Sequence, residues 1–217
     1  MGENISEATS RSVTGLNRQL QNNRFPGMIE TVAAYCSLAV FFDPLVITYE
    51  EALCEIRKAE TMTSEPVRVK ERVIDIPVAY GGEYGPDLKY LAGLKGISAE
   101  EIIKLHTGVK YTVGMIGFSP GFPYLIGLPK KLAAPRKQTP RQKIPAGSVG
   151  IAGQQTGIYP AETPGGWQII GRTPLKLFNI HRSEPFLLQA GDRVIFRPVS
   201  PGEFNGLSKG ENTYADG

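Results

Sequence analysis

Residues 102–161 contain no aspartate and no glutamate. The same stretch carries 8 lysine and arginine residues, so its formal net charge is +8. Residues 1–101 have a net charge of −5 and residues 162–217 a net charge of 0, which leaves the 217-residue chain at +3. The small total therefore hides one concentrated positive segment. We expect this segment to line a pocket for a small anion or a contact with a partner protein, and not a nucleic-acid surface.

Cysteine and histidine are scarce, with 2 residues of each. They are too few for a disulfide scaffold or a Cys-rich zinc site, so no metal site is expected. Cys36 and Cys54 are interpreted as reduced thiols that are buried or half-buried. No secretory signal pattern is visible, and no apolar run reaches the ~20 residues that span a bilayer. We therefore predict a cytoplasmic protein with no membrane partner.

Common nucleotide and metal motifs are missing as well. The sequence has no G-x-x-x-x-G-K-[ST] loop, no G-x-G-x-x-G fingerprint and no H-E-x-x-H or C-x-x-C pair, which excludes ATP, NAD and zinc sites of those types. Residues 117–121 match the hydrolase pattern G-x-S-x-G, but Pro120 follows the serine and has no N–H to offer an oxyanion. Ser119 is therefore rejected as a nucleophile. His106 is interpreted as a packing residue near a helix end, and His181 as a loop residue.

The first part of the chain, residues 1–66, is predicted to be a small α+β domain. Ser6 is a plausible N-cap, and Thr48 with Glu51 three residues later forms a capping box. The expected elements are a helix over 6–22, strands over 28–34 and 37–42, a helix over 49–60 and a polar hinge over 61–66.

Residues 67–200 are predicted to form a closed or nearly closed β-barrel, followed by a flexible tail over 201–217. Residues 117–174 hold 19 glycines and prolines in 58 positions, which favours short strands joined by shaped loops. The expected strands are 67–78, 111–116, 148–152, 167–170, 175–179 and 193–198. Two short helices are expected over 87–92, with Pro86 at its first position, and over 99–107, begun by Ser98 and Glu101.

Two prolines each stand directly before an arginine in the acid-free segment, at Arg136 and Arg141. Each proline stiffens the backbone just before its arginine, so less conformational entropy is lost when the arginine binds a ligand. The planar guanidinium group of arginine suits carboxylate and phosphate. We predict that both arginines bind anions, because no carboxylate of the segment neutralises them locally. The neighbouring lysines are interpreted as a solvated rim: Lys130, Lys131, Lys137 and Lys143. Trp167, the single tryptophan, is compatible with the core or with a pocket wall.

The ordered motifs of this region resemble those of the KipI and allophanate-hydrolase-subunit-1 family, whose members are mostly described as the B subunit of a bacterial ATP-dependent 5-oxoprolinase. The resemblance covers nearly the whole chain. Its matching segments are 26–44, YGGEYGPDL at 80–88, HT at 106–107, GFSPGFPYL at 117–125, PR at 135–136, TPR at 139–141, PAGSVGIAG at 145–153, QTGIYP at 155–160, TPGGWQIIGRTP at 163–174 and GDRV at 191–194.

The resemblance implies a small N-terminal α+β domain followed by a C-terminal cyclophilin-like β-barrel of the carboxyltransferase subdomain C type. Family members usually carry a further segment ahead of the position of Gly2, and it forms a first strand. That strand is expected to be absent here, so the N-terminal sheet is expected to have an exposed edge. The resemblance also implies that the chain assembles with the A and C subunits of 5-oxoprolinase into a hydrolase that converts 5-oxoproline to glutamate with ATP. Whether this chain itself contacts ATP stays open.

Within this resemblance we assign roles to ten residues. The catalytic candidates, as charge stabilisers or polar groups, are Arg136, Arg141, Arg172 and Ser148. The candidates for substrate binding are Phe118, Phe122, Gln155, Thr156, Tyr159 and Trp167. The alternative function is that of a KipI-like inhibitor, which would bind a sensor histidine kinase through the cyclophilin-like groove.

Overall fold

The computed structural model describes residues 6–62 and 71–209, and the chain divides into two compact units, Met1–Glu71 and Arg72–Gly217. The division lies a few residues beyond the boundary predicted after residue 66. Residues 63–66 of the predicted hinge lie outside the described residues.

The N-terminal unit contains two helices and a two-stranded sheet: α1 (Glu7–Asn22), β1 (Met28–Ala33), β2 (Leu38–Phe42) and α2 (Tyr49–Met62). The Ser6 hydroxyl accepts a hydrogen bond from the Thr9 N–H and caps α1. Thr48 and Glu51 form the predicted capping box, since each side chain accepts a hydrogen bond from the other's backbone N–H. Local side-chain chemistry therefore begins both helices where the sequence predicted.

Antiparallel pairing of β1 with β2 presents one face of the sheet to the helices. Leu16 and Leu20 of α1 and Ala52 and Ala59 of α2 pack with Phe25 and Met28 in one apolar cluster. Within the described residues both strands are edge strands.

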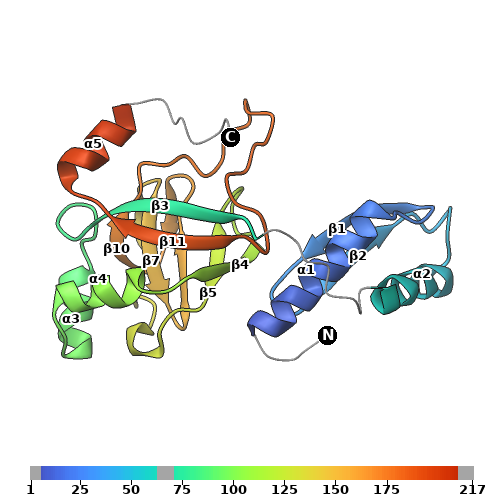
Figure 1. The fold of residues 1–217 in the computed structure, drawn as a ribbon, viewed down its shortest axis with the longest axis horizontal. Coiled ribbons are helices and arrows are strands. Elements are labelled where there is room, and N and C mark those ends of the chain that lie inside the picture. The colour runs from blue at the N-terminus through green and yellow to red at the C-terminus, as the bar shows by residue number, and fades with distance from the viewer. Residues whose placement is uncertain (1–5, 63–70, 210–217) are drawn as a thin grey trace. The chain divides into compact units, whose positions relative to one another are not determined.

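The C-terminal unit is built on a closed barrel with the strand order β10-β3-β11-β4-β5-β8-β7 (Figure 1). Strands β3 and β11 are parallel, and the other neighbours are antiparallel. The predicted closed barrel is therefore confirmed. Its strands are β3 (Val73–Tyr80), β4 (Tyr111–Ile116), β5 (Pro123–Ile126), β7 (Ser148–Ala152), β8 (Gln155–Ile158), β10 (Gln168–Arg172) and β11 (Arg193–Pro198).

The remaining elements of this unit lie outside the closed sheet (Figure 1). A separate two-stranded sheet pairs β6 (Arg141–Ile144) with β9 (Thr163–Gly165). The helices are α3 (Leu88–Lys95), α4 (Ala99–Thr107), a short 3₁₀ helix η1 (Lys130–Leu132) and α5 (Pro201–Lys209). Ser98 caps α4 as predicted, because its hydroxyl accepts from the Glu101 N–H.

Four predictions for this unit need correction. The first strand begins at Val73, and residues 67–70 lie outside the described part. Helix α3 begins after Asp87, so Pro86 precedes the helix instead of opening it. Residues 175–179 form no barrel strand, because β10 pairs directly with β3 and closes the sheet; this segment pairs instead with 185–187 in a loop. Finally, 201–209 is helix α5 and not a tail, since Phe204 is buried against Tyr84.

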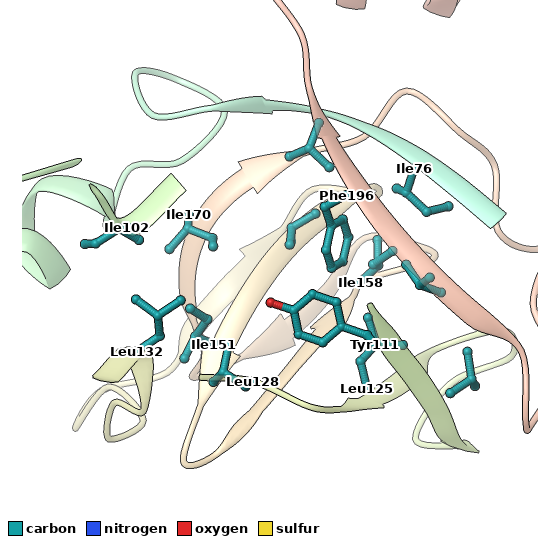
Figure 2. Packing of buried hydrophobic residues seen from close by; sticks show 14 of the residues in the cluster. Ile76, Ile102, Tyr111, Leu125, Leu128, Leu132, Ile151, Ile158, Ile170 and Phe196 are labelled. Atoms are coloured by element: carbon teal, nitrogen blue, oxygen red, sulfur yellow. The ribbon is translucent and has the colours of Figure 1, made fainter. Parts of the chain in front are cut away.

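Aliphatic and aromatic side chains from every strand fill the barrel (Figure 2). Tyr111 and Phe196 point toward each other across the interior, with ring centroids 5.3 Å apart in an edge-on arrangement (Figure 2). Helix α4 contributes Ile102 to the same cluster. Among the described residues, no helix combines the length and apolarity that crossing a bilayer requires.

Replacement of Ile158 should test this core. Ile158→Ala removes a fully buried side chain of the barrel interior, so we expect the free energy of unfolding to fall by about 2–5 kcal/mol. The matched control is Ile180→Ala, because Ile180 is 71% exposed in the same unit and its loss should change stability by less than about 0.5 kcal/mol. Urea titration followed by fluorescence of Trp167, the single tryptophan, reports on this unit. Equal losses in the two variants would contradict the packing described here.

Candidate functional site

Asp87, which lies outside the acid-free segment 102–161, contacts two basic residues of that segment. Arg141 binds Asp87 through two parallel hydrogen bonds, from Nη1 to Oδ2 at 2.8 Å and from Nη2 to Oδ1 at 2.7 Å. Lys137 Nζ lies 3.3 Å from the same Oδ1. No carboxylate of the acid-free segment pairs with Arg141, as expected, but Asp87 from outside the segment does, and Lys137 belongs to this cluster instead of a solvated rim. Because Asp87 and Arg141 are 54 residues apart in the sequence, no local pattern indicated that they form an ion pair.

Backbone contacts hold Asp87 in place. Its N–H donates to the Ile169 carbonyl at 2.9 Å, and its Oδ2 accepts from the Ile169 N–H at 2.7 Å, so both peptide groups of one β10 residue bind it. Gly85 allows this approach, because a Cβ at that position would lie 2.0 Å from the Ile170 carbonyl oxygen. The loop between β3 and α3 is thus fastened to β10 before it meets Arg141.

The protonation state of Asp87 follows from these contacts. Burial alone raises the pKa of its carboxyl group, but the hydrogen bonds from Arg141, the Ile169 N–H and Lys137 outweigh burial and hold the pKa below its usual value. The group is therefore ionised at neutral pH. One negative charge then faces two positive ones, so the cluster keeps a net positive charge.

Next to this cluster lies a group of packed aromatic rings, with Phe122 at its centre. The Phe122 ring contacts those of Tyr124, Tyr159 and Trp167, with centroids 4.7, 5.1 and 5.4 Å away. The rings pack on β8 at Gly157, where a Cβ would come within 3.0 Å of Phe122 and 3.1 Å of Trp167. Phe122, Tyr159 and Trp167, which we predicted for one site, are therefore brought together.

Tyr159 connects the aromatic rings to the arginines. Burial raises the pKa of its phenol to about 12, although the charges of Arg136 and Arg141 act in the opposite direction. Tyr159 is therefore a neutral hydrogen-bonding group at neutral pH and not a base. The electrostatic influence of Arg136 on both Tyr124 and Tyr159 places this exposed arginine beside the rings.

Phe118 stands at the rim of the aromatic group. It is 66% exposed, and its ring meets Phe122 edge-on at 5.6 Å. Its φ of +68° is the single positive value among the described non-glycine residues, and such a backbone costs a side chain about 1–3 kcal/mol. Ser119 follows it, and among the described residues its buried hydroxyl has no hydrogen-bond partner. Neither histidine is hydrogen-bonded to Ser119 through its ring in the described part of the chain.

The other four candidates belong to the barrel strands β7, β8 and β10. Thr156 is buried inside the barrel and bonds to His106. Arg172 Nε donates to the Ala146 carbonyl at 2.7 Å and so braces a turn. Ser148 is buried and stands opposite Arg172 in the β7–β10 register. Gln155 is half-buried at the start of β8. The geometry therefore supports Arg136, Arg141 and the aromatic residues as one site more directly than it supports these four.

His106 belongs to a buried network that the sequence did not reveal. The Thr156 hydroxyl donates to the Gly150 carbonyl at 3.0 Å, so it must accept from His106 Nε2, which is 3.0 Å away. His106 Nδ1 then carries no proton and accepts from the Tyr80 hydroxyl at 2.8 Å. Complete burial lowers the pKa of this histidine to about 3. The imidazole is therefore neutral and structural, as its interpretation as a packing residue predicted.

The chain is similar to several known proteins. The sequence pattern of a protein family described as carboxyltransferase domain, subdomain C and D, matches residues 1–188. The chain is 43% identical to the 5-oxoprolinase B subunit of Bacillus subtilis, with 97% of this chain and 92% of that protein aligned. It is 45% identical to the 5-oxoprolinase B subunit of Haemophilus influenzae over 86% of this chain and 85% of the relative.

Solved structures show the same fold. The protein TTHA0988 superimposes with a TM-score of 0.82 at 37% identity; the match covers 92% of this chain but 39% of that longer chain. An uncharacterised protein of Pyrococcus horikoshii, PH0987, is 44% identical with a TM-score of 0.61, and 94% and 93% of the two chains align. The Kluyveromyces lactis urea amidolyase shares the fold at 21% identity and a TM-score of 0.76.

The pH dependence of stability should reveal the neutral histidine. Because the folded-state pKa of His106 lies near 3 and the ordinary value is 6.5, the unfolded chain binds the proton more tightly. The contribution of His106 is therefore complete above about pH 6.5 and is lost as the pH falls toward 3, by up to about 1.4 kcal/mol per pH unit. Urea unfolding between pH 4 and 7 measures this slope, and the slope should flatten in His106→Gln, which cannot titrate.

Nitrogen NMR adds an independent check of the same histidine. We expect the His106 signals to show the neutral Nε2–H tautomer down to pH 4, and His181→Ala removes the other imidazole from the spectrum. A His106 signal that becomes cationic near pH 6 would contradict the buried network.

Proposed function

Since this chain belongs to the family of carboxyltransferase domains, subdomain C and D, we propose that it is the B subunit of an ATP-dependent 5-oxoprolinase, which opens 5-oxoproline to glutamate in the cytoplasm. The observation that carries this proposal is the 43% identity to the Bacillus subtilis protein along 97% of the chain. The relatives named above favour this function over inhibition of a sensor histidine kinase.

The basic cluster is the anion-binding part of the proposed site. It consists of Arg136, Lys137 and Arg141, with Asp87 as its one paired carboxylate among the described residues. 5-Oxoproline carries a carboxylate, and ATP-dependent chemistry introduces phosphate, so both the substrate and any phosphorylated intermediate are anionic. A hydrogen bond between charged partners is worth roughly 1.5–3 kcal/mol, enough to orient a small molecule.

The aromatic group supplies the apolar side of the same site. Phe118, which is 66% exposed, would contact the ring methylenes of 5-oxoproline, and the buried rings of Phe122, Tyr159 and Trp167 would support it from behind. The Tyr159 hydroxyl would remain protonated, as its raised pKa requires, and would offer a neutral hydrogen bond. Arg172, Ser148, Gln155 and Thr156 would act on the site through the strands that carry them.

The chain would work as one part of an assembly. Of the described groups with nucleophilic or basic character near the site, Ser119 has no hydrogen-bonded base, and Tyr159 keeps its proton. We therefore assign binding and charge stabilisation to this chain and the use of ATP to the complex with the A and C subunits. The protein TTHA0988, in which the equivalent of this chain makes up 39% of a longer polypeptide, supports a partner in close association.

Reconstitution tests the proposal directly. The chain mixed with the A and C subunits should form glutamate from 5-oxoproline, and omission of ATP or of any one of the three proteins should abolish it. Coupled glutamate detection measures the product. If the three proteins together form no glutamate with ATP, the proposed function is wrong.

Replacement of Arg136 should lower the activity of the complex without affecting the folding of the chain. Arg136→Ala is expected to lower kcat/KM for 5-oxoproline by about 10- to 100-fold, because a charged partner of the substrate is lost. The chain should still fold, since Arg136 is exposed and makes no ion pair with any described residue. Arg182→Ala, on a loop outside the site, serves as the control and should keep full activity. An active Arg136→Ala complex would remove this residue from the site.

A further inference from the structure

We propose that Asp87 is a positioning residue, which sets Arg141 and Lys137 side by side so that together they bind the carboxylate or phosphate group of the reacting molecule. This inference rests on the proposed function and assigns a role to a residue to which the motifs gave none. Three features of the structure support it.

First, Asp87 has no capacity left for a ligand. Its Oδ1 accepts from Arg141 Nη2 and Lys137 Nζ, and its Oδ2 accepts from Arg141 Nη1 and the Ile169 N–H. A carboxylate offers about four acceptor positions, so all of them are occupied. The side chain is only 5% exposed. Asp87 therefore cannot act as a base or touch substrate, and its effect must pass through the groups that it holds.

Second, both cations keep donors on their outer sides. Arg141 has five N–H groups and gives two of them to Asp87, while Lys137 has three and gives one. Their side chains are 28% and 30% exposed, in contrast to the buried carboxylate. Because both bind the same Oδ1, their charged ends are neighbours, and both side chains are partly open to solvent. This spacing suits the two oxygens of one anion.

Third, the charges do not balance. A pair that only fastens a strand needs one cation for one carboxylate, but here a second cation is added within a stretch that has no acid of its own. Arg136 stands next to Lys137 in the chain and raises the surplus. By contrast, Lys143 and Glu162 form a simple one-to-one pair at 3.4 Å with both side chains exposed. The excess positive charge at Asp87 is thus available to an external anion.

The variant Asp87→Asn tests this role. Asparagine is similar in size to aspartate, but its side chain has an NH2 group where Arg141 and Lys137 need an acceptor. The two cations should therefore separate. In the assembled complex we expect the KM for 5-oxoproline to rise by about 10- to 100-fold, with a smaller change in kcat. The control is Glu162→Gln, which breaks the exposed Lys143 pair and should leave KM unchanged.

A second set of variants distinguishes positioning from mere stability. In the background Lys137→Ala with Arg141→Ala, the additional Asp87→Asn change should not raise KM further, because its effect passes through those two residues. Arg141→Lys keeps the charge but loses the fork, and it should raise KM even where Asp87→Asn fails to fold. Trp167 fluorescence and urea unfolding report folding for each variant. An unchanged KM in a folded Asp87→Asn complex, whatever its stability or kcat, would overturn the proposal.

Direct binding separates this inference from the proposed function. Titration calorimetry of the full chain with 5-oxoproline, and separately with inorganic phosphate, should show weaker binding in Asp87→Asn than in the wild type. If the wild-type complex forms no glutamate, the proposed function fails, yet the calorimetric difference still supports Asp87. Equal binding by the two chains, or no binding by the wild type, would refute the positioning role.

Discussion

The arrangement of the proposed site depends on one buried carboxylate. Asp87 joins the loop after β3 to β10 through both peptide groups of Ile169, and it joins both to β6 through Arg141. These elements are distant in sequence and belong to two different sheets. A charge removed from water is costly unless it is fully paired, so this carboxylate tolerates only the arrangement that satisfies it. The pairing of Asp87 with Arg141 therefore helps to hold the small β6–β9 sheet against the barrel.

The wall of the barrel separates two kinds of packing. Strand β8 shows this clearly, because Thr156 points inward to His106 whereas Gly157 leaves room for Phe122 and Trp167 on the outer face. Inside, a few polar groups are satisfied within an aliphatic core. Outside, aromatic rings lie beside a surplus of positive charge. The alternation of neighbouring residues along one strand thus gives the interior its stability and the exterior its chemistry.

The sequence predicted those features that short-range chemistry determines. Ser6, Thr48 and Ser98 begin helices as expected, and β4, β7 and β11 have their predicted bounds. Prediction from the sequence failed where contacts between distant segments determine the structure. No local pattern pairs Asp87 with Arg141. Residues 175–179, with apolar side chains at 175, 177 and 178, resemble a strand although β10 and β3 already close the sheet. The site was predicted in part for the same reason: the acid-free segment marked Arg136 and Arg141, but the partner of Arg141 lies outside that segment.

The backbone at Phe118 has a consequence for the thermodynamics of association at this surface. Its turn is closed by hydrogen bonds from the Ser119 N–H to Gly117 and from the Phe122 N–H to Ser119, so the backbone that carries the exposed ring is fixed by the fold. A ring on a flexible loop loses conformational entropy when a molecule packs against it. At Phe118 the backbone part of that entropy is already lost when the chain folds, and the strained φ is the enthalpic counterpart of this rigid turn.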